Sequence, residues 1–388
     1  MSEPADRLRL GVSVGALAVV VGVPSFEDFG RHLPGLPWAP YVWVLVTAIL
    51  ASATLTLPGR SASLQQVLRS PLLTAVLLVA MTVTGAVLFE RQFGRDLNGT
   101  GSTLALAMSS PVHAFVAGHG LYGAHLPGGA PVSPGPAWIL FNSPFTLAHA
   151  FWLFVSAWVV VTALVLRRTY GHGLEVNLGL TVLGTSPHFL HLVSAGADVI
   201  PVGCALVLLV VGADRLVPRA GPWPALIGLG AGILATSRVI YLGIPLLIGL
   251  LVWRRSRPAA AVIAGVGVTF ALTSEILVAA LGTSFPPMHL FDRASTNQPA
   301  SVVIVGVVVS LAVFGLAIRR VTADLRSWMI WTALCFSVPH VFIGLGELET
   351  SPHIAAWEGS NYLLVCAIPV VVAVFAARRA TAACPAVL

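Results

Sequence analysis

The sequence predicts an all-α membrane protein with many spans, and two observations carry that prediction. The 388-residue chain is 57% hydrophobic and only 9% charged, with a mean hydropathy of +0.90, whereas soluble domains carry about 25% charged residues. Apolar stretches of about 15 to 22 residues also recur between short polar segments, and about 20 apolar residues cross a bilayer as a helix. We therefore expect a bundle of membrane-spanning helices.

About twelve stretches are long and apolar enough to be predicted as spans. In chain order they are 10–25, 38–57, 71–89, 148–166, 174–192, 199–214, 222–237, 239–253, 258–281, 301–318, 327–343 and 361–377. The first could be mistaken for a signal peptide, but it lacks a small-residue cleavage site and another apolar stretch follows closely. We interpret it as a membrane helix.

The distribution of arginine predicts how the bundle is oriented. Every Lys or Arg position in the chain is arginine, and the cytoplasmic loops of membrane proteins retain positive charge. With a cytoplasmic N-terminus, only Arg31, Arg91, Arg95, Arg238 and Arg293 fall outside. Both termini are then cytoplasmic, in a bacterial-type plasma membrane. This bias explains the net charge of +6, so nucleic acid is not an expected partner.

Three outer segments, 90–137, 284–299 and 344–360, contain most of the polar residues that could do chemistry. The segment 90–137 is the longest, and long ordered loops in compact proteins are usually functional. Its residues 101–115 predict a helix along the membrane surface, with Leu104, Leu106 and Met108 in the headgroup region. The glycines and prolines that follow it, between 118 and 136, force turns.

The order of several short motifs resembles a known superfamily. Asp96 follows a membrane helix, and the long outer loop then contains Gly-Leu-Tyr at 120–122 and Ser-Pro-Gly-Pro at 133–136. Further along, Ser-Ala-Gly-Ala-Asp at 194–198 forms a short outer turn, and Ala-Thr-Ser-Arg at 235–238 ends a helix. The chain thereby resembles the GT-C membrane glycosyltransferases, in particular the bacterial enzymes, such as mannosyltransferases, that use polyprenyl-phosphate sugars.

The resemblance implies a division of the chain. Residues 71–377 would form the GT-C-like catalytic core, with 90–137 as its first outer loop carrying surface helices. Residues 1–70 would be an additional transmembrane hairpin, and 378–388 a cytoplasmic tail.

A second alignment starts at the first span and makes Glu27 and Asp28 the acidic pair after the helix. We disfavour it because only about a dozen residues separate the first two spans, which is too short for surface helices at about 1.5 Å per residue.

The resemblance also implies a reaction at the extracytoplasmic face. A sugar would move, with inversion, from polyprenyl phosphate to a hydroxyl of a cell-envelope glycan or glycolipid. Such a transfer needs a carboxylate that takes the hydroxyl proton, and Asp96 is our candidate base. The leaving phosphate needs positive charge beside it, and Arg238 is our candidate, because an arginine between two short spans is costly unless it faces an anion or a cavity.

Further outer residues are candidates for binding. His188 and His191, spaced i, i+3 at a helix end, are expected to share a face and to donate hydrogen bonds to the donor phosphate or sugar. Asp198 could alternatively cap the span that begins at 199. The candidate substrate-binding residues are Asp198, His119, Tyr122, Trp357 and Glu358.

No cofactor is implied apart from the lipid-linked sugar phosphate. The chain has no CxxC pair and no fixed metal-ligand spacing, so it predicts no metal site and leaves a metal requirement open. The expected partners are membrane lipids, the donor and the acceptor.

Two other functions stay open. A secondary transporter would place ionisable residues at mid-depth on broken helices, and Glu275, inside a predicted span, with Pro187 and Pro245 would suit it. Against this, the ionisable residues concentrate at one face, and the sequence shows no pair of inverted halves. The third possibility is a catalytically inactive lipid-binding protein of the same fold, since a fold does not establish activity.

Overall fold

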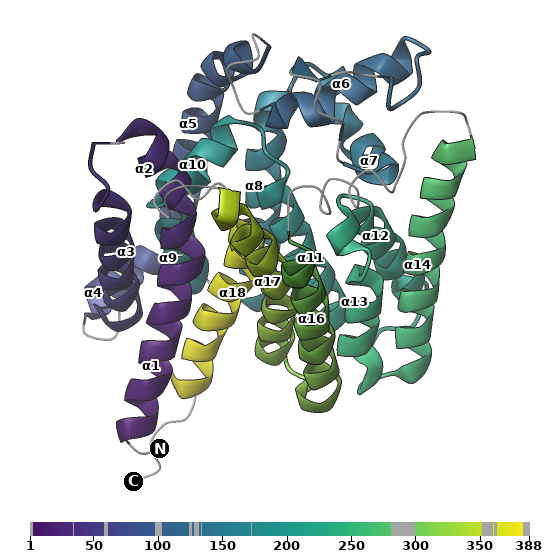
Figure 1. Cartoon of the computed structure of the whole chain (residues 1–388). Helices are drawn as coiled ribbons and strands as arrows, with labels where there is room; N and C mark the ends of the chain where they lie inside the picture. Colours follow the sequence, from purple (N-terminus) through teal and green to yellow (C-terminus); the bar gives the residue numbers. More distant parts are fainter. Residues whose placement is uncertain are drawn as a thin grey trace.

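Every regular element in the described part of the chain is a helix, which confirms the predicted all-α class (Figure 1). The computed structural model describes residues 3–33, 35–57, 61–97, 103–123, 126–127, 132, 134–171, 173–280, 299–350, 360 and 363–382.

The elements follow one another as antiparallel helices with short connections. Those of the first half are α1 (Glu3–Leu17), η1 (Ala18–Gly22), η2 (Val23–Ser25), α2 (Phe26–His32), α3 (Ala39–Thr56), α4 (Ala62–Arg69), α5 (Pro71–Leu97), α6 (Leu104–Val116), α7 (Pro136–Leu147), η5 (Phe151–Leu153) and α8 (Phe154–Tyr170). Those of the second half are α9 (Gly173–Gly184), α10 (Pro187–Ser194), α11 (Val199–Leu216), α12 (Trp223–Ala235), η6 (Val239–Tyr241), α13 (Ile244–Trp253), α14 (Arg257–Ala280), α16 (Ala300–Arg320), α17 (Leu325–Thr350) and α18 (Leu363–Ala382).

Seven segments of the described chain are long and apolar enough to cross a membrane. They are Leu8–Gly30, Ala39–Thr56, Pro71–Arg95, Phe151–Tyr170, Val199–Leu216, Arg257–Val278 and Ala300–Arg320. Further apolar helices are shorter, at 10 to 17 residues. The chain is therefore a multi-pass membrane protein by the length and composition of its helices, while the count of about twelve spans stays a prediction.

The first apolar segment changes its helix type before α2. α1 passes into the π-helical turn η1 and the 3-10 turn η2, which contains Pro24. Proline has no N–H, and its ring clashes with the carbonyl four residues earlier, so a regular α-helix cannot continue through it. The change of winding leads into α2, whose first turn carries Glu27 and Asp28.

A second interruption divides the predicted span 174–192 into α9 and α10. Ser186 caps α10 by accepting a hydrogen bond from the Phe189 N–H at 3.3 Å, and Pro187 occupies the first helical turn. A serine cap followed by proline is a strong helix start, so the chain begins a new helix here. His188 and His191 lie on this short helix.

One end of the bundle is covered by α6 and α7, and we call it the α6–α7 end (Figure 1). α5 reaches toward it and continues to Leu97, well beyond the predicted span end at residue 89. The predicted surface helix is present as α6, but the predicted lipid contacts of Leu106 and Met108 are wrong. Both side chains are buried in the hydrophobic core of the protein.

The centre of the bundle is α11, the most buried of the seven candidate spans. It packs against α8, α12, α17 and α18. Beside it, α12 and α14 approach closely through glycines, because a Cβ on Gly232 would lie 2.6 Å from the Gly267 carbonyl oxygen. Small residues allow such close backbone contact between membrane helices.

The first and last helices of the chain are also in contact. α1 and η1 pack against α18. Just before α18, the Ser360 hydroxyl donates to the Pro24 carbonyl at 3.3 Å. The bundle is thus closed by residues from its two extremes.

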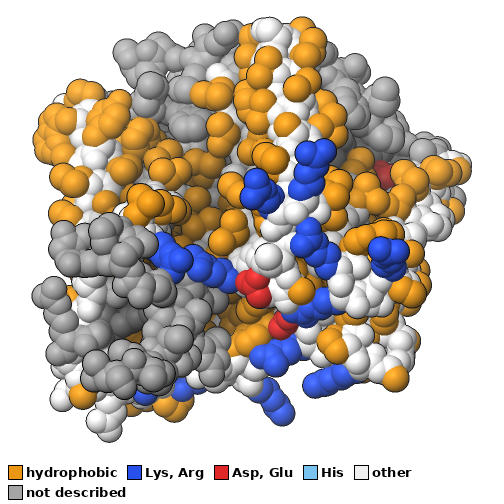
Figure 2. Space-filling model, turned by 90° about the horizontal axis from the view of Figure 1, so that it is seen from below, with side chains coloured by type: hydrophobic (Ala, Val, Ile, Leu, Met, Phe, Trp, Pro, Cys, Tyr) orange, Lys and Arg blue, Asp and Glu red, His pale blue; other side chains and the backbone are white. Residues whose placement is uncertain are grey.

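Arginine side chains gather at the end opposite to α6 and α7, where α1 begins and α18 ends (Figures 1 and 2). Several of them bind the helix ends there, since Arg254 donates to the Arg319 carbonyl and Arg215 to the Thr169 carbonyl. We call this the arginine-rich end. Its residues come from the loops that were predicted to be cytoplasmic.

Candidate functional site

Asp198 and Arg238 form a buried ion pair near the α6–α7 end. Arg238 Nη1 lies 2.7 Å from Asp198 Oδ2, and Nη2 lies 2.8 Å from Oδ1. The Asp198 side chain is 4% exposed and the Arg238 side chain 20%. Two parallel charge-assisted hydrogen bonds fix the guanidinium in orientation as well as in place.

The pair sits where a helix begins. Asp198 immediately precedes α11, but its side chain makes no capping hydrogen bond to that helix. The capping alternative is therefore wrong, because both carboxylate oxygens bind Arg238 instead. The positive end of the helix dipole still favours a carboxylate at this position.

Arg238 is recessed because the hairpin that carries it is short. α12 has 13 residues and α13 has 10, or roughly 20 Å and 15 Å of helix, and the hairpin ends below the tip of α14 (Figure 1). The turn is stabilised locally, since the Thr236 and Ser237 hydroxyls donate to the Ile233 and Leu234 carbonyls. The anion that the recessed arginine faces is the Asp198 carboxylate.

The Gly/Pro-rich outer loop is docked on this turn. The Gly135 N–H donates to the Thr236 carbonyl at 2.7 Å, and the Trp138 N–H donates to Thr236 Oγ1 at 3.0 Å. A Cβ at residue 135 would lie 2.1 Å from the Thr236 carbonyl oxygen, so glycine is required by the close approach. Two motifs a hundred residues apart in the sequence are thereby in direct contact.

Tyr122 belongs to the same contact. Its hydroxyl donates to the Pro134 carbonyl at 2.9 Å. Burial raises the pKa of the Tyr122 phenol far above its usual value, the Glu275 carboxylate raises the pKa further, and the Arg238 guanidinium opposes the shift. The phenol therefore lies within electrostatic range of both charged groups.

Glu275 of α14 completes this polar cluster. Its Oε1 lies 2.7 Å from the position that a Cβ on Gly135 would take. Its Oε2 is buried and has no hydrogen-bond partner among the described residues. A carboxylate held under a loop with one unpartnered oxygen can accept a proton or a hydrogen bond from a ligand. We call Asp198, Arg238, Tyr122 and Glu275 the loop-covered cluster.

His188 and His191 lie in a second polar cluster, with the acidic pair of α2. His188 Nδ1 is 2.9 Å from Asp28 Oδ2, and His191 Nδ1 is 3.5 Å from Asp28 Oδ1. His188 Nε2 lies 3.7 Å from Glu27 Oε2. The two imidazole rings are stacked with centroids 5.7 Å apart, so they share a helix face as the i, i+3 spacing predicts.

The second cluster is more enclosed than the first. His188 is 1% exposed, and Glu27 and Asp28 are buried as well. Beneath it, Ser186 and Ser25 hydroxyls lie 3.3 Å apart, and Ser186 also donates to the Val21 carbonyl. The histidines therefore contact carboxylates of the N-terminal hairpin, and no printed contact joins them to Arg238 or Asp198.

The remaining predicted residues are not joined to either cluster. Asp96 lies in the last turn of α5, where the structure describes its backbone. His119 is exposed in the turn after α6. Trp357 and Glu358 lie outside the described residues. Within the described residues, no group of three or more His, Cys, Asp or Glu side chains is arranged to hold a metal ion.

Sequence reasoning underrated two groups that the structure puts in contact with predicted residues. Glu27 and Asp28 belonged to the disfavoured alignment, yet they bind both predicted histidines. Glu275 was weighed mainly for a transporter, although it lies beside the outer loop. The signal for both was the same, since each is an acidic residue inside an apolar stretch.

A comparison of the chain with protein-family models, with curated proteins and with solved structures finds no match in any of the three.

Proposed function

We propose that this chain is a membrane glycosyltransferase of GT-C type that moves a sugar from a polyprenyl-phosphate donor to a glycan or glycolipid acceptor at the extracytoplasmic face. The observation that carries the proposal is the loop-covered cluster, in which a fixed arginine and a carboxylate with an unpartnered oxygen lie under the same loop. The motif order in the sequence supplies the reaction class.

The reaction requires a simple exchange of bonds. The acceptor hydroxyl oxygen bonds to the anomeric carbon from the side opposite to the phosphate, and the bond from that carbon to the phosphate oxygen breaks. The electron pair leaves with the polyprenyl phosphate, and the hydroxyl proton passes to a carboxylate. Positive charge near the departing phosphate stabilises the transition state.

Arg238 would supply that positive charge. Its contact with Asp198 fixes the guanidinium before a substrate binds, and such preorganisation is the main source of electrostatic catalysis. Asp198 also neutralises part of its charge. This makes binding weaker than for a lone arginine, but it allows the cation to be buried.

The proton would go to Asp96, the carboxylate that the motif order favours. Its backbone lies at the α6–α7 end of α5. Glu275 is a second candidate base because of its unpartnered oxygen, and Asp28 is a third. The three can be distinguished because they lie on different helices.

The experiment is sugar transfer by the purified protein in lipid nanodiscs, with a panel of radiolabelled polyprenyl-phosphate sugars. We expect turnover by the wild type, and loss of turnover with retained donor binding in Asp96→Asn. Glu275→Gln and Asp28→Asn are matched controls, each replacing one carboxylate by its amide. Arg238→Lys keeps the charge but loses the two-point contact, so weaker donor binding is expected.

The result identifies the base. If only Glu275→Gln loses turnover, the proton acceptor is on α14 and the assignment of Asp96 is wrong. If no donor in the panel is bound or turned over by the wild type, the glycosyltransferase proposal fails.

A proton-coupled transporter is the second candidate, and the buried Asp28–His188 contact favours it. Carboxylate and imidazole groups beside a break between α9 and α10 resemble the ionisable sites of transporters with interrupted helices. Uptake of labelled solutes into liposomes under an imposed pH gradient would test this. Flux that is lost in Asp28→Asn, without any sugar transfer, would replace the enzyme proposal.

A further inference from the structure

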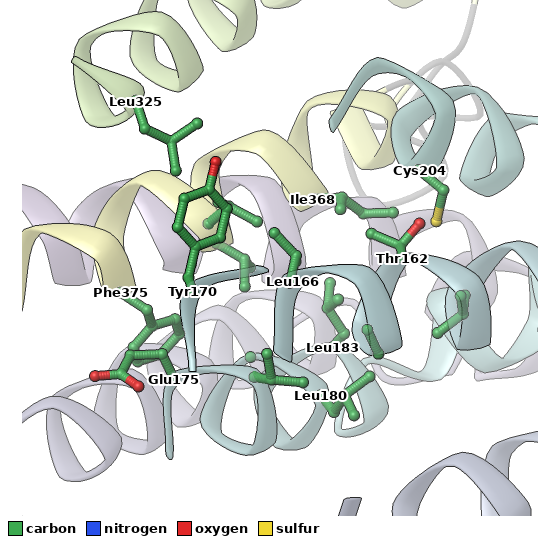
Figure 3. Close-up of a pocket in the computed structure, with 16 residues that line it drawn as sticks. Thr162, Leu166, Tyr170, Glu175, Leu180, Leu183, Cys204, Leu325, Ile368 and Phe375 are labelled. Carbon is green, nitrogen blue, oxygen red and sulfur yellow. The ribbon is translucent and has the colours of Figure 1, made fainter. Parts of the chain in front are cut away.

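An apolar cavity lies far from the loop-covered cluster, among α8, α9, α11 and α18 (Figure 3). Its empty volume is about 680 Å³, including the part that opens outward. Lining side chains include Val159, Leu166, Leu180, Ile368 and Phe375. A space with such a lining holds water poorly, and it is large enough for an organic ligand, since ligand sites measure about 300–1,000 Å³.

The cavity has the depth of one membrane leaflet. On α8 its lining extends from Val159 to Tyr170, which is roughly 16 Å of helix at 1.5 Å per residue. Half of the hydrocarbon core of a bilayer is about 15 Å. The cavity therefore matches the length over which a lipid chain extends from its headgroup to the bilayer centre.

The two ends of the cavity differ in polarity (Figure 3). At the inner end lie Thr162 and Cys204, both buried. At the other end lie Tyr170 and Glu175, where α8 ends and α9 begins at the arginine-rich end. A hydrocarbon chain fits the interior, and a headgroup would lie at the Tyr170 end.

Positive charge exceeds negative charge at the Tyr170 end. The Arg215 guanidinium lies 4.3 Å from the centre of the Tyr170 ring. Asp214 accepts a hydrogen bond from the Tyr170 hydroxyl at 2.9 Å, but the same carboxylate is shared by Arg215 and Arg255. Exposed Arg168 adds to this charge, and Glu175 opposes it. Arginine clusters of this kind at a membrane surface attract anionic lipid headgroups.

We propose that this cavity binds one acyl chain of an anionic phospholipid from the leaflet at the arginine-rich end, with the headgroup beside Arg215. The site is separate from the proposed transfer site, which is at the opposite end of the bundle. Bound lipid would fill the space between α8, α9 and α18 and stabilise the packing of α18 in the bundle. Filling an internal void restores dispersion contacts that its lining otherwise lacks.

Photocrosslinking tests the site directly. The full chain is placed in phosphatidylcholine nanodiscs that contain a small share of phosphatidylglycerol with a diazirine at the chain terminus. Irradiation should attach the lipid to peptides of α8, α9 or α18 that line the cavity. Excess unlabelled phosphatidylglycerol should compete, whereas excess phosphatidylcholine should compete less.

A filling variant and its control sharpen the test. Ala163 lines the cavity and is 4% exposed, whereas its neighbour Leu164 faces outward and is 52% exposed. Ala163→Phe should reduce crosslinking to cavity peptides by roughly tenfold, corresponding to about 1.4 kcal/mol of binding free energy. Leu164→Phe should leave it unchanged. Arg215→Gln should reduce the preference for phosphatidylglycerol while crosslinks stay within the cavity.

Three results would overturn the proposal. Crosslinking that persists in a folded Ala163→Phe protein would mean that the chain lies elsewhere. Crosslinks confined to outward-facing peptides around Leu164 would show only surrounding lipid. Equal competition by phosphatidylcholine and phosphatidylglycerol would remove the anionic headgroup from the proposal. If Ala163→Phe does not fold, Arg215→Gln and the competition series still decide between these results.

Discussion

The two ends of α11 carry the same type of ion pair in two different settings. Asp198 precedes the helix and binds Arg238 alone through two hydrogen bonds. Asp214, near the other end, is shared among Arg255, Arg215 and the Tyr170 hydroxyl. The first pair has side chains that are 4% and 20% exposed, and the second has side chains that are 14% and 24% exposed.

The helix dipole explains why the two settings differ. A carboxylate is favoured at the N-terminal end of a helix and disfavoured at the C-terminal end. Asp198 therefore needs a single cation, whereas Asp214 is compensated by two arginines at the negative end of the dipole. The comparison separates a tightly fixed pair beside unpartnered polar groups from a shared pair that mainly holds helix ends together.

The largest effect is expected from breaking the Asp198 pair. Arg238→Ala leaves a buried carboxylate without its cation, and losing one partner of a buried pair costs about 3–5 kcal/mol. Thermal unfolding of the purified protein in detergent should show a clearly lower midpoint. The double variant Asp198→Leu with Arg238→Met is the control, because an apolar pair should recover most of the loss. A wild-type midpoint in Arg238→Ala would contradict the described burial.

The docking of the outer loop should be the next most sensitive feature. Gly135→Ala forces a Cβ against the Thr236 carbonyl oxygen and the Glu275 carboxylate, and such overpacking costs about 1–3 kcal/mol. We expect faster proteolysis of the loop and loss of the proposed transfer activity. Gly243→Ala is the matched control, since no atom lies within 4 Å of its added Cβ. Equal proteolysis of the two variants would argue against the docking.

Breaking the Asp214 pair should cost less than breaking the Asp198 pair. In Arg255→Gln, Asp214 keeps Arg215 and the Tyr170 hydroxyl, so the loss should be about 1–2 kcal/mol, the value of one charged hydrogen bond. The unfolding midpoint measured beside Arg238→Ala gives the comparison directly. A larger loss for Arg255→Gln would reverse our ranking of the two ends.

The smallest effect is expected from Tyr122→Phe, which removes a single hydrogen bond worth about 1 kcal/mol. It also tests the raised pKa of this phenol. Below pH of about 10 the phenol is neutral in both folded and unfolded chains, so its contribution is complete there. As pH rises further, only the unfolded chain releases the proton, and stability falls. This fall should be smaller in Tyr122→Phe, and identical pH profiles would contradict the burial of the hydroxyl.

Composition and apolar periodicity predicted the class of fold because lipid requires long apolar helices. Helix ends were less predictable. α5 continues to Leu97 through charged residues that hydropathy excludes, because a helix can extend beyond the bilayer into water. α6 runs through Pro111, which we had interpreted as an interruption. Its apolar face packs on protein, and a single sequence does not distinguish a protein contact from a lipid contact.

The site was predicted residue by residue but not as an arrangement. Asp198, Arg238 and Tyr122 were each singled out, yet for separate roles. Their contact depends on α11 packing against α12 and on the return of the outer loop, and neither has a local signal. His188 and His191 were paired correctly by their spacing, while their carboxylate partner Asp28 lies 160 residues earlier in the chain. Spacing along one helix is predictable, whereas pairing between helices requires the packed bundle.

The contact between the first and last helices has a consequence for biosynthesis. Ser360 and Pro24 are 336 residues apart, and at about 5–20 residues per second their synthesis is separated by on the order of tens of seconds. During that time the face of α1 that packs on α18 has no partner within the chain, and lipid or an insertion chaperone must cover it. The nascent N-terminal hairpin is therefore the part of this protein most exposed to degradation before translation ends.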